Sequence, residues 1–146
     1  MKLLKEFIIG KNQLPEVVDF LMNLKKRYPI ITFTGPLGAG KTTLVQLFLK
    51  RCGVQETITS PTFTIMNSYH NNKGETFYHF DLYRLTNLDD FFQGGFEEYL
   101  YQPNSVVCIE WPEIIMPFLN TISEKVCSVV LDYSDIDKRI IKIITQ

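Results

Sequence analysis

The first part of the chain carries apolar residues at the spacing of an amphipathic helix. The recurring apolar positions are Leu14, Val17, Val18, Leu21 and Leu24. Pro15 suits a first helical turn, the basic residues 25–27 favour a C-terminal end, and Pro29 cannot continue a helix. The pattern therefore predicts one helix that begins near Pro15 and ends before Pro29.

Two short continuous apolar runs, residues 30–34 and 105–109, have the composition of buried strands. A glycine-rich turn follows the first run. Residues 43–50 after that turn are predicted to form a helix that ends near Gly53.

The remaining segments are shorter and are separated by turn-forming residues. We predict strands over residues 63–69 and 76–82 with a turn at 71–74, an interrupted helical stretch over 89–100, a short helix over 114–119, and two terminal strands over 125–131 and 139–144 joined by residues 132–137. Helices that alternate with strands indicate an α/β layer fold. The two hairpin-like pairs indicate that the sheet is mixed, although mostly parallel, with helices flanking it.

Composition narrows the class of protein. A length of 146 residues suits a single domain, 1–146, and 45% apolar with 21% charged residues argues against a disordered or membrane protein. Fifteen basic against sixteen acidic residues give a net charge of −1. This balance lacks the basic excess of a protein that grips a nucleic-acid backbone, so we expect any contact with nucleic acid to be indirect or local.

The sequence has no recognisable targeting signal and no cysteine pattern typical of disulfides, so we expect a cytoplasmic protein with reduced thiols. No stretch reaches the roughly 20 apolar residues of a membrane-spanning helix, and the first residues do not resemble a signal peptide. The three cysteines form no CxxC pair, and the two histidines, His70 and His79, lie apart in sequence. A disulfide framework or a zinc cluster is therefore not expected.

Residues 35–42, Gly-Pro-Leu-Gly-Ala-Gly-Lys-Thr, match the phosphate-binding pattern G-x-x-x-x-G-K-[ST] between a predicted strand and a predicted helix. Backbone N–H groups of such a loop surround phosphate oxygens, and the following helix points its positive end at the same anion. Lys41 would supply a mobile charge to the outer phosphates, Thr42 would ligate Mg²⁺, and Thr43 would bond an inner phosphate. The phosphate-binding residues predicted here are Gly38, Ala39, Gly40, Lys41, Thr42 and Thr43. No guanine-reading Asn-Lys-x-Asp occurs, which favours ATP.

A second magnesium ligand is expected at the end of a neighbouring strand. Glu110 directly follows the run 105–109, and a carboxylate there would face the ligand crevice of an α/β sheet. Glu113 is the weaker competitor because Pro112 turns the chain away first. Thr42 and Glu110 are thus the predicted metal ligands.

Asp81 is a further candidate, placed near the end of a predicted strand. Strand alternation puts His79, Asp81 and Tyr83 on one face. This face is polar enough to line a site, but it is equally consistent with a solvent-exposed surface. Asp81 would hold a water of the magnesium shell or orient the attacking water. Residues 60–63, Ser-Pro-Thr-Phe, resemble a segment that senses the γ-phosphate, and their simpler interpretation is a loop entering a strand.

Four segments in this order resemble the TsaE (YjeE) family of bacterial ATPases. They are residues 35–43, residues 60–64 (Ser-Pro-Thr-Phe-Thr), residues 79–85 (His-Phe-Asp-Leu-Tyr-Arg-Leu) and residues 109–113 (Ile-Glu-Trp-Pro-Glu). The resemblance spans most of the chain and implies a P-loop NTPase-like three-layer fold. One departure is Pro36, where the family usually has an acidic residue. A proline there stiffens the loop without removing a required side chain, so we expect nucleotide binding to survive.

The resemblance implies a role in forming the threonylcarbamoyladenosine modification next to the tRNA anticodon. Family members bind ATP and Mg²⁺, hydrolyse ATP slowly and act with TsaD and TsaB, which leaves tRNA an indirect partner. By matching position, residues 38–43 hold the phosphates, Thr42 and Glu110 hold Mg²⁺, and Asp81 lies near the γ-phosphate. Lys41, Asp81 and Glu110 are the catalytic residues so implied. Candidate contacts to the base are Lys11, Asn12 and Arg139. An arginine can stack on adenine, although a solvated arginine at a strand end is the simpler interpretation of Arg139.

Two other functions remain open at this point. A small-molecule or nucleotide kinase of this fold usually has several lid arginines, whereas this chain has only Arg27, Arg51, Arg84 and Arg139. A non-catalytic, nucleotide-gated binding module would use ATP to order residues 60–63. With no obvious arginine finger, and only Arg84 as a weak internal candidate, intrinsic hydrolysis is expected to be slow.

Overall fold

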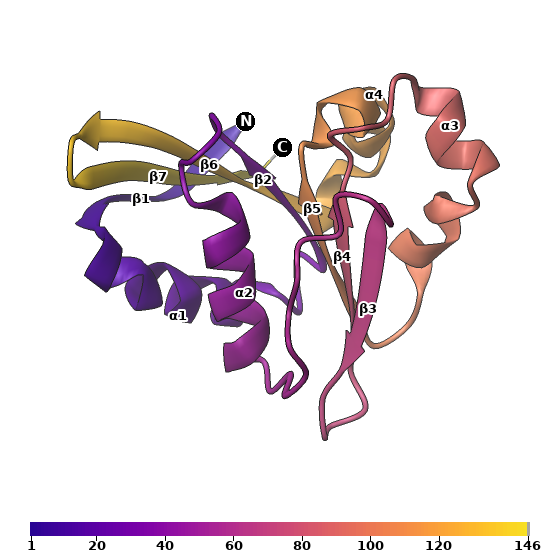
Figure 1. The fold of residues 1–146 in the computed structure, drawn as a ribbon, viewed down its shortest axis with the longest axis horizontal. Helices are drawn as coiled ribbons and strands as arrows, with labels where there is room; N and C mark the ends of the chain where they lie inside the picture. Colours follow the sequence, from indigo (N-terminus) through magenta and orange to yellow (C-terminus); the bar gives the residue numbers. More distant parts are fainter. Residues whose placement is uncertain (146) are drawn as a thin grey trace.

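The computed structural model describes residues 1–145, in which seven strands form one sheet with the order β1-β7-β6-β2-β5-β4-β3 (Figure 1). The strands are β1 (Lys2–Gly10), β2 (Ile30–Thr34), β3 (Met66–His70), β4 (Thr76–Asp81), β5 (Ser105–Glu110), β6 (Val126–Asp135) and β7 (Lys138–Thr145).

The sheet is mixed, as the hairpin-like pairs predicted. Four central neighbours, β6, β2, β5 and β4, run parallel to one another. At the two sides, β7 and β3 run antiparallel to their neighbours, and β1 pairs antiparallel with β7. Five strands therefore share one direction, which confirms the mostly parallel arrangement.

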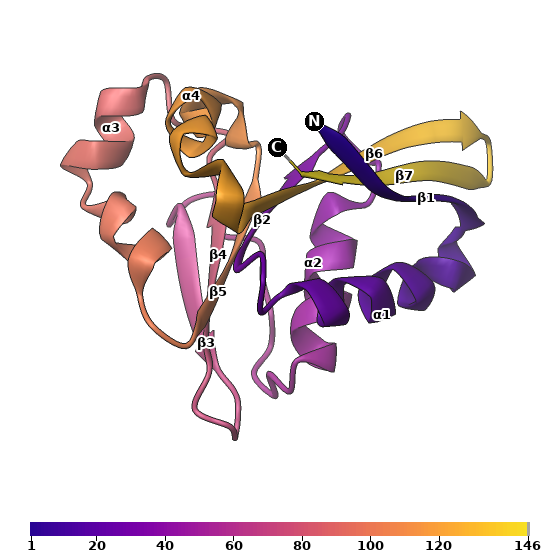
Figure 2. The ribbon, with the colours of Figure 1, turned by 180° about the vertical axis from the view of Figure 1, so that it is seen from behind.

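Helices cover both faces of this sheet (Figures 1 and 2). The α-helices are α1 (Leu14–Leu24), α2 (Lys41–Arg51), α3 (Leu88–Gln93) and α4 (Met116–Leu119), and the 3₁₀ segments are η1 (Lys11–Gln13), η2 (Phe96–Tyr101), η3 (Pro112–Ile115) and η4 (Asn120–Lys125). α1 and α2 pack on one face, and the segments from α3 to α4 pack on the other. The result is the three-layer α/β architecture that the sequence predicted.

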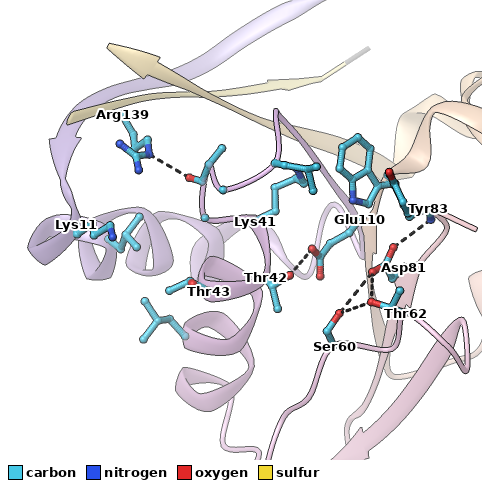
Figure 3. Close-up of a pocket in the computed structure, with 17 residues that line it drawn as sticks. Lys11, Lys41, Thr42, Thr43, Ser60, Thr62, Asp81, Tyr83, Glu110 and Arg139 are labelled. Atoms are coloured by element: carbon cyan, nitrogen blue, oxygen red, sulfur yellow. Dashed lines mark hydrogen bonds between the residues drawn. The ribbon is translucent and has the colours of Figure 1, made fainter. Parts of the chain in front are cut away.

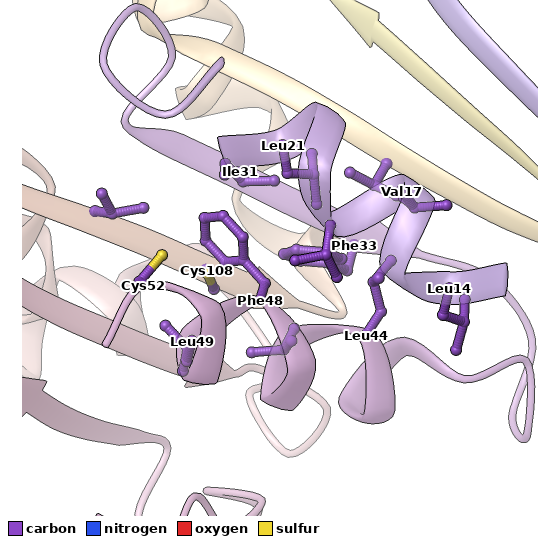
Figure 4. Packing of buried hydrophobic residues seen from close by; sticks show 14 of the residues in the cluster. Leu14, Val17, Leu21, Ile31, Phe33, Leu44, Phe48, Leu49, Cys52 and Cys108 are labelled. Carbon is purple, nitrogen blue, oxygen red and sulfur yellow. The ribbon is translucent and has the colours of Figure 1, made fainter. Parts of the chain in front are cut away.

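Each face of the sheet has its own hydrophobic core. On the α1–α2 face, Leu21 and Phe48 pack with Phe33 of β2 (Figure 4). On the other face, Phe80 of β4 and Phe91 of α3 belong to a second cluster. Successive residues of a strand point to opposite faces, so the apolar central strands contribute to both clusters.

The predicted strand over residues 63–69 is wrong at its start, because β3 begins only at Met66. A turn precedes it, closed by the Ile65 amide donating to the Pro61 carbonyl at 2.7 Å, with Ile65 at φ +70°. The hydroxyl of Thr62 donates to Asp81 at 3.0 Å, which ties this stretch to the end of β4 by a side chain.

Two features of the sheet were not predicted. β1 was not predicted because its five apolar residues, 3–4 and 7–9, do not alternate with polar ones, and the strand lies at a sheet edge where eight of its nine residues are not fully buried. The predicted connection 132–137 is mostly strand, since β6 continues to Asp135 and Tyr133 pairs with Arg139 of β7. The exposed polar residues at this end of the hairpin resemble a loop in composition.

The helical predictions agree better with the structure. The helix after the glycine-rich turn is α2, and the interrupted stretch 89–100 is divided into α3 and η2 at Gly94 and Gly95, with Gly95 at φ +74°. The predicted helix 114–119 is divided between η3 and α4. None of the helices within the described residues is long and apolar enough to cross a bilayer.

Candidate nucleotide-binding site

A cavity of about 620 Å³ lies at the carboxyl ends of the parallel strands, between the glycine-rich loop and the ends of β4 and β5 (Figure 3). Asp81 and Glu110, the last residues of those two strands, are paired in register. Ligands of open α/β sheets bind at this edge. The cavity lining includes all of the predicted phosphate-binding residues from 38 to 43 together with Asp81 and Glu110.

The glycine-rich loop follows a path that favours glycine at positions 35 and 38. A Cβ atom on Gly35, at φ +151°, would stand 2.5 Å from the Leu131 carbonyl oxygen of β6. Gly38 has φ +79°, and its Cβ would stand 3.0 Å from the Tyr133 hydroxyl. The loop therefore passes directly against the β6 backbone and leads into α2, whose first amides have no intrahelical partner and are available to an anion.

Lys41 is held by its own loop in this structure. Its side chain is only 5% exposed, and Nζ donates to the Gly35 carbonyl and to the Pro36 carbonyl at 3.1 Å. Nζ also lies 4.1 Å from the ring centroid of Trp111, a residue with φ +54°. Burial lowers the pKa of Lys41 more than the nearby carboxylates raise it. A phosphate that binds here must replace the two carbonyl contacts.

Each carboxylate oxygen of Glu110 contacts one polar side chain. The Thr42 hydroxyl donates to its Oε1 at 2.6 Å, and His79 Nε2 lies 2.5 Å from its Oε2. Glu110 is 2% exposed and His79 is fully buried. The carboxylate is thereby oriented toward the first turn of α2, where Thr42 begins the helix with Lys41.

The oxygens of Thr42 and Glu110 fit a magnesium site. Two oxygens bound side by side in an octahedral magnesium shell at about 2.1 Å lie about 3 Å apart. The observed separation of 2.6 Å requires only a small outward movement to admit the ion. Within residues 1–145 no group of three or more His, Cys, Asp or Glu side chains gathers as a metal site.

Asp81 is buried, and its oxygens accept three hydrogen bonds. Thr62 donates to Oδ2 at 3.0 Å, Ser60 donates to the same oxygen at 3.5 Å, and the Tyr83 amide donates to Oδ1 at 3.1 Å. These contacts join residues 60–62 to the end of β4 (Figure 3). The sequence left open whether the His79–Asp81 face is a site or a wet surface; both side chains are buried, and Asp81 lines the cavity.

The far end of the cavity is lined by Lys11, Leu14, Leu47 and Arg139, so two of the three predicted base contacts reach it. Asn12 does not; it lines a neighbouring cavity of about 580 Å³ that also includes Lys11 and Arg139.

The β6–β7 hairpin also contacts the glycine-rich loop. Arg139 Nε donates to the Ala39 carbonyl at 3.3 Å, and its guanidinium lies 4.3 Å from the ring centroid of Tyr133. The Tyr133 hydroxyl donates to the Leu37 carbonyl at 3.1 Å. Two side chains of one hairpin thus donate to two carbonyls of the glycine-rich loop.

The chain matches a model of a known protein family. The family model described as "Threonylcarbamoyl adenosine biosynthesis protein TsaE" matches residues 10–141. This chain belongs to the TsaE family. The match includes the glycine-rich loop, Asp81 and Glu110, and stops within β7.

Individual TsaE relatives cover most of the chain. A protein from Rickettsia felis named tRNA threonylcarbamoyladenosine biosynthesis protein TsaE is 35% identical over 94% of this chain and 77% of its own length. A protein of the same name from Aquifex aeolicus is 30% identical over 94% of this chain and 92% of its own length. The crystal structure of Bacillus subtilis YdiB has a similar fold, with a TM-score of 0.65 and 24% identity over 99% of this chain and 88% of that chain.

Some site residues of this TsaE family member were not predicted as such. Leu14 and Leu47 line the cavity but were assigned to amphipathic helices, whose apolar residues are usually core. Tyr133 contacts the phosphate loop from a segment predicted as a connection. Its only sequence signal was an aromatic residue among polar ones. Glu113, the weaker metal candidate, is exposed and does not line the cavity.

Proposed function

We propose that this TsaE family protein binds ATP together with Mg²⁺ in the 620 Å³ cavity and hydrolyses ATP slowly. The observation that carries the proposal is the convergence of three segments on one cavity: the phosphate loop, the Thr42–Glu110 pair, and Asp81 with its bound hydroxyls. The hydrolysis would support formation of the tRNA threonylcarbamoyladenosine modification, with the TsaB–TsaD assembly as the protein partner.

The phosphates would bind at the N-terminus of α2. Loop amides and the helix end favour an anion there, and Lys41 already lies inside the cavity wall. Its ammonium would leave the carbonyls of Gly35 and Pro36 and donate to the β- and γ-phosphates. The charge that develops on these oxygens during hydrolysis would then be stabilised by the loop amides and by Lys41 in its new position.

Thr42 and Glu110 would hold the magnesium ion, which would supply positive charge that neutralises the phosphates. The remaining ligands would come from the nucleotide and water, since no group of three or more His, Cys, Asp or Glu side chains gathers as a metal site within residues 1–145. A charge-dense carboxylate beside a hydroxyl is the donor set that Mg²⁺ prefers.

The attacking water would be oriented by Asp81 or by Glu110. Asp81 Oδ2 already accepts from Thr62 and Ser60, yet each carboxylate oxygen has two acceptor positions, so Oδ1 with its single donor keeps capacity for a water. Hydrolysis should be slow because Arg139 is the only arginine among the described cavity-lining residues, and its side chain donates to the Ala39 carbonyl of the glycine-rich loop. Arg84 instead stacks on Phe63, at 4.2 Å from the ring centroid.

The test is phosphate release by purified protein with ATP and Mg²⁺. We expect Lys41→Ala and Thr42→Ala to lose at least about a hundredfold in rate, because each removes a group that stabilises transferred charge. Thr42→Ser keeps the hydroxyl and is the matched control, expected to retain most activity. Unaltered hydrolysis in both alanine variants, with the fold checked by circular dichroism, would refute the site assignment.

The partner part of the proposal is tested by a pull-down with TsaB and TsaD, with and without ATP. Nucleotide-dependent retention of TsaD and TsaB is the expected result. The net charge of −1 agrees with a protein that acts on a protein assembly and leaves tRNA to its partners. Equal retention with and without ATP would show that the association does not depend on the nucleotide.

A non-catalytic nucleotide gate is the second candidate, favoured by the position of Ser60 and Thr62 in the lining of the cavity, where a bound nucleotide would act on them. Such a gate would use ATP to order residues 60–62, and hydrolysis would be incidental. Glu110→Ala separates the two functions: a gate that does not need the metal keeps supporting its partner, whereas the hydrolytic function is lost. A kinase would release little phosphate without its acceptor, so the same assay tests that function.

A further inference from the structure

His79 lies directly behind the candidate metal ligand. It is on β4, two residues before Asp81, and pairs with Cys108 of β5. The imidazole is fully buried, and it does not line the cavity, so Glu110 separates it from any ligand there. Its Nε2 lies 2.5 Å from Glu110 Oε2.

The two oxygens of Glu110 have different partners. Oε1 accepts from the Thr42 hydroxyl at the cavity, and Oε2 faces His79 in the interior. A carboxylate held at both oxygens cannot rotate about its last bond. His79 therefore helps to fix the orientation of the Glu110 carboxylate, with one oxygen toward α2 and any cation bound with Thr42.

The surroundings of the other ring nitrogen of His79, Nδ1, also indicate that the residue serves its contact with Glu110. Nδ1 is buried and has no hydrogen-bond partner among the described residues. A neutral ring that carries its proton on Nε2 donates to Glu110 and leaves only the Nδ1 lone pair unsatisfied. Buried polar atoms in native proteins are almost always paired, so packing alone would favour an apolar residue here, as with Phe77 two positions earlier on the same face.

We propose that His79 is a positioning residue: it donates Nε2–H to Glu110 Oε2 and thereby orients Oε1 toward Thr42 and the magnesium ion. This inference rests on the proposed function, since it gives His79 a role in metal binding by that site. Partners that hydrogen-bond a metal ligand from behind commonly change metal affinity by about 10- to 100-fold when they are removed. His79 does not touch the nucleotide, so nucleotide affinity without metal should not depend on it.

The experiment measures ADP binding by the fluorescence of Trp111, the single tryptophan, in EDTA and then across a magnesium titration. His79→Phe keeps an aromatic ring without a donor, and His79→Gln places an amide N–H near the position of Nε2. We expect His79→Phe to raise the half-saturating magnesium concentration about tenfold or more, while ADP affinity in EDTA stays within about twofold of wild type. His79→Gln should recover most of the magnesium affinity.

Phe77→Leu is the matched packing control, because Phe77 is equally buried on the same strand and face but touches neither Glu110 nor the cavity. It should lower thermal stability and leave the magnesium titration unchanged. Wild-type magnesium affinity in His79→Phe would overturn the inference, and so would equal losses in His79→Phe and His79→Gln. Loss of ADP binding in EDTA by either His79 variant would also overturn it, since the role would then be structural.

Failure of the proposed function would look different. If wild-type protein binds ADP with no dependence on magnesium, the metal site itself is wrong and the role of His79 is overturned with it. If wild type shows the magnesium dependence and His79→Phe shares it, only the inference about His79 fails.

Discussion

The two walls of the cavity are built in different ways. The phosphate loop and α2 form one wall, in which backbone conformation sets the geometry, as the positive φ angles of Gly35 and Gly38 show. The ends of β4 and β5 form the other wall, in which side-chain hydrogen bonds join Glu110 and Asp81 to segments distant in sequence. A backbone wall is encoded locally by residue type, whereas a side-chain wall depends on strands being brought together by the whole fold.

The sharpest test of the backbone wall is Gly35→Ala. Its Cβ would stand 2.5 Å from the Leu131 carbonyl oxygen, which requires the loop or β6 to move. Strain and overpacking together should lower the free energy of unfolding by about 3 kcal/mol. Urea-induced unfolding measures this change.

Gly95→Ala is the matched control for Gly35→Ala. Gly95 also has a positive φ, +74°, but a Cβ there meets no atom within 4 Å. It should lower the free energy of unfolding by only about 1 kcal/mol, the cost of the left-handed conformation. Equal losses at the two sites would show that close approach to β6 is not what constrains the loop.

On the side-chain wall, Thr62→Val removes the hydroxyl that donates to Asp81 at 3.0 Å while keeping the shape of the side chain. Because Asp81 is buried and loses a donor, the free energy of unfolding should fall by about 1 kcal/mol in urea. Thr64→Val, at an exposed position where the hydroxyl donates to Asn67 Oδ1 at 3.2 Å, should change it much less. If both variants lose the same amount, the link between residues 60–62 and β4 contributes little.

The smallest expected effect is on the pH dependence of stability. Burial lowers the pKa of Lys41 in the folded protein below its ordinary value of 10.5, against the attraction of Glu110, Glu113 and Asp81. The buried ammonium of Lys41 therefore lowers the stability of the folded protein, and this loss is complete at pH values below the folded-state pKa. Between that pKa and 10.5 the unfolded chain binds more protons than the folded protein, so the loss of stability disappears as pH rises to 10.5.

Relative to Lys41→Met, the nucleotide-free wild-type protein should therefore gain stability as pH rises toward 10.5. Parallel urea titrations of the two proteins across this range measure the difference. If the free energy of unfolding of wild type minus that of Lys41→Met stays constant or falls as pH rises, burial does not outweigh the attraction of the carboxylates in setting the pKa of Lys41.

The same contrast explains how far the sequence alone could predict the site. The glycine-rich loop was predicted with its strand and helix because its pattern is contiguous and each residue type follows from local geometry. Glu110 and Asp81 were predicted as candidates from their positions at strand ends, and the structure brings both to the cavity. Their roles toward metal and water stay predictions.

Contacts between distant segments were harder to predict. The contact of Tyr133 with the loop depends on a hairpin whose outer end resembles a connection in composition, and β1 was missed because its edge position leaves most side chains exposed. The bond from His79 to Glu110 depends on the register of two parallel strands, which one sequence does not reveal. Residues 63–65 were predicted as strand because nothing local shows that Thr62 bonds Asp81.

β4 pairs with β5 residue for residue, so the number of residues in each strand determines which side chains lie opposite each other. Deleting or inserting one residue before His79 would bring Tyr78 or Phe80 to its place and turn the polar side chains toward the opposite core. We therefore expect insertions among TsaE relatives to accumulate in the turns at either end of these strands, while the number of residues inside each strand stays the same.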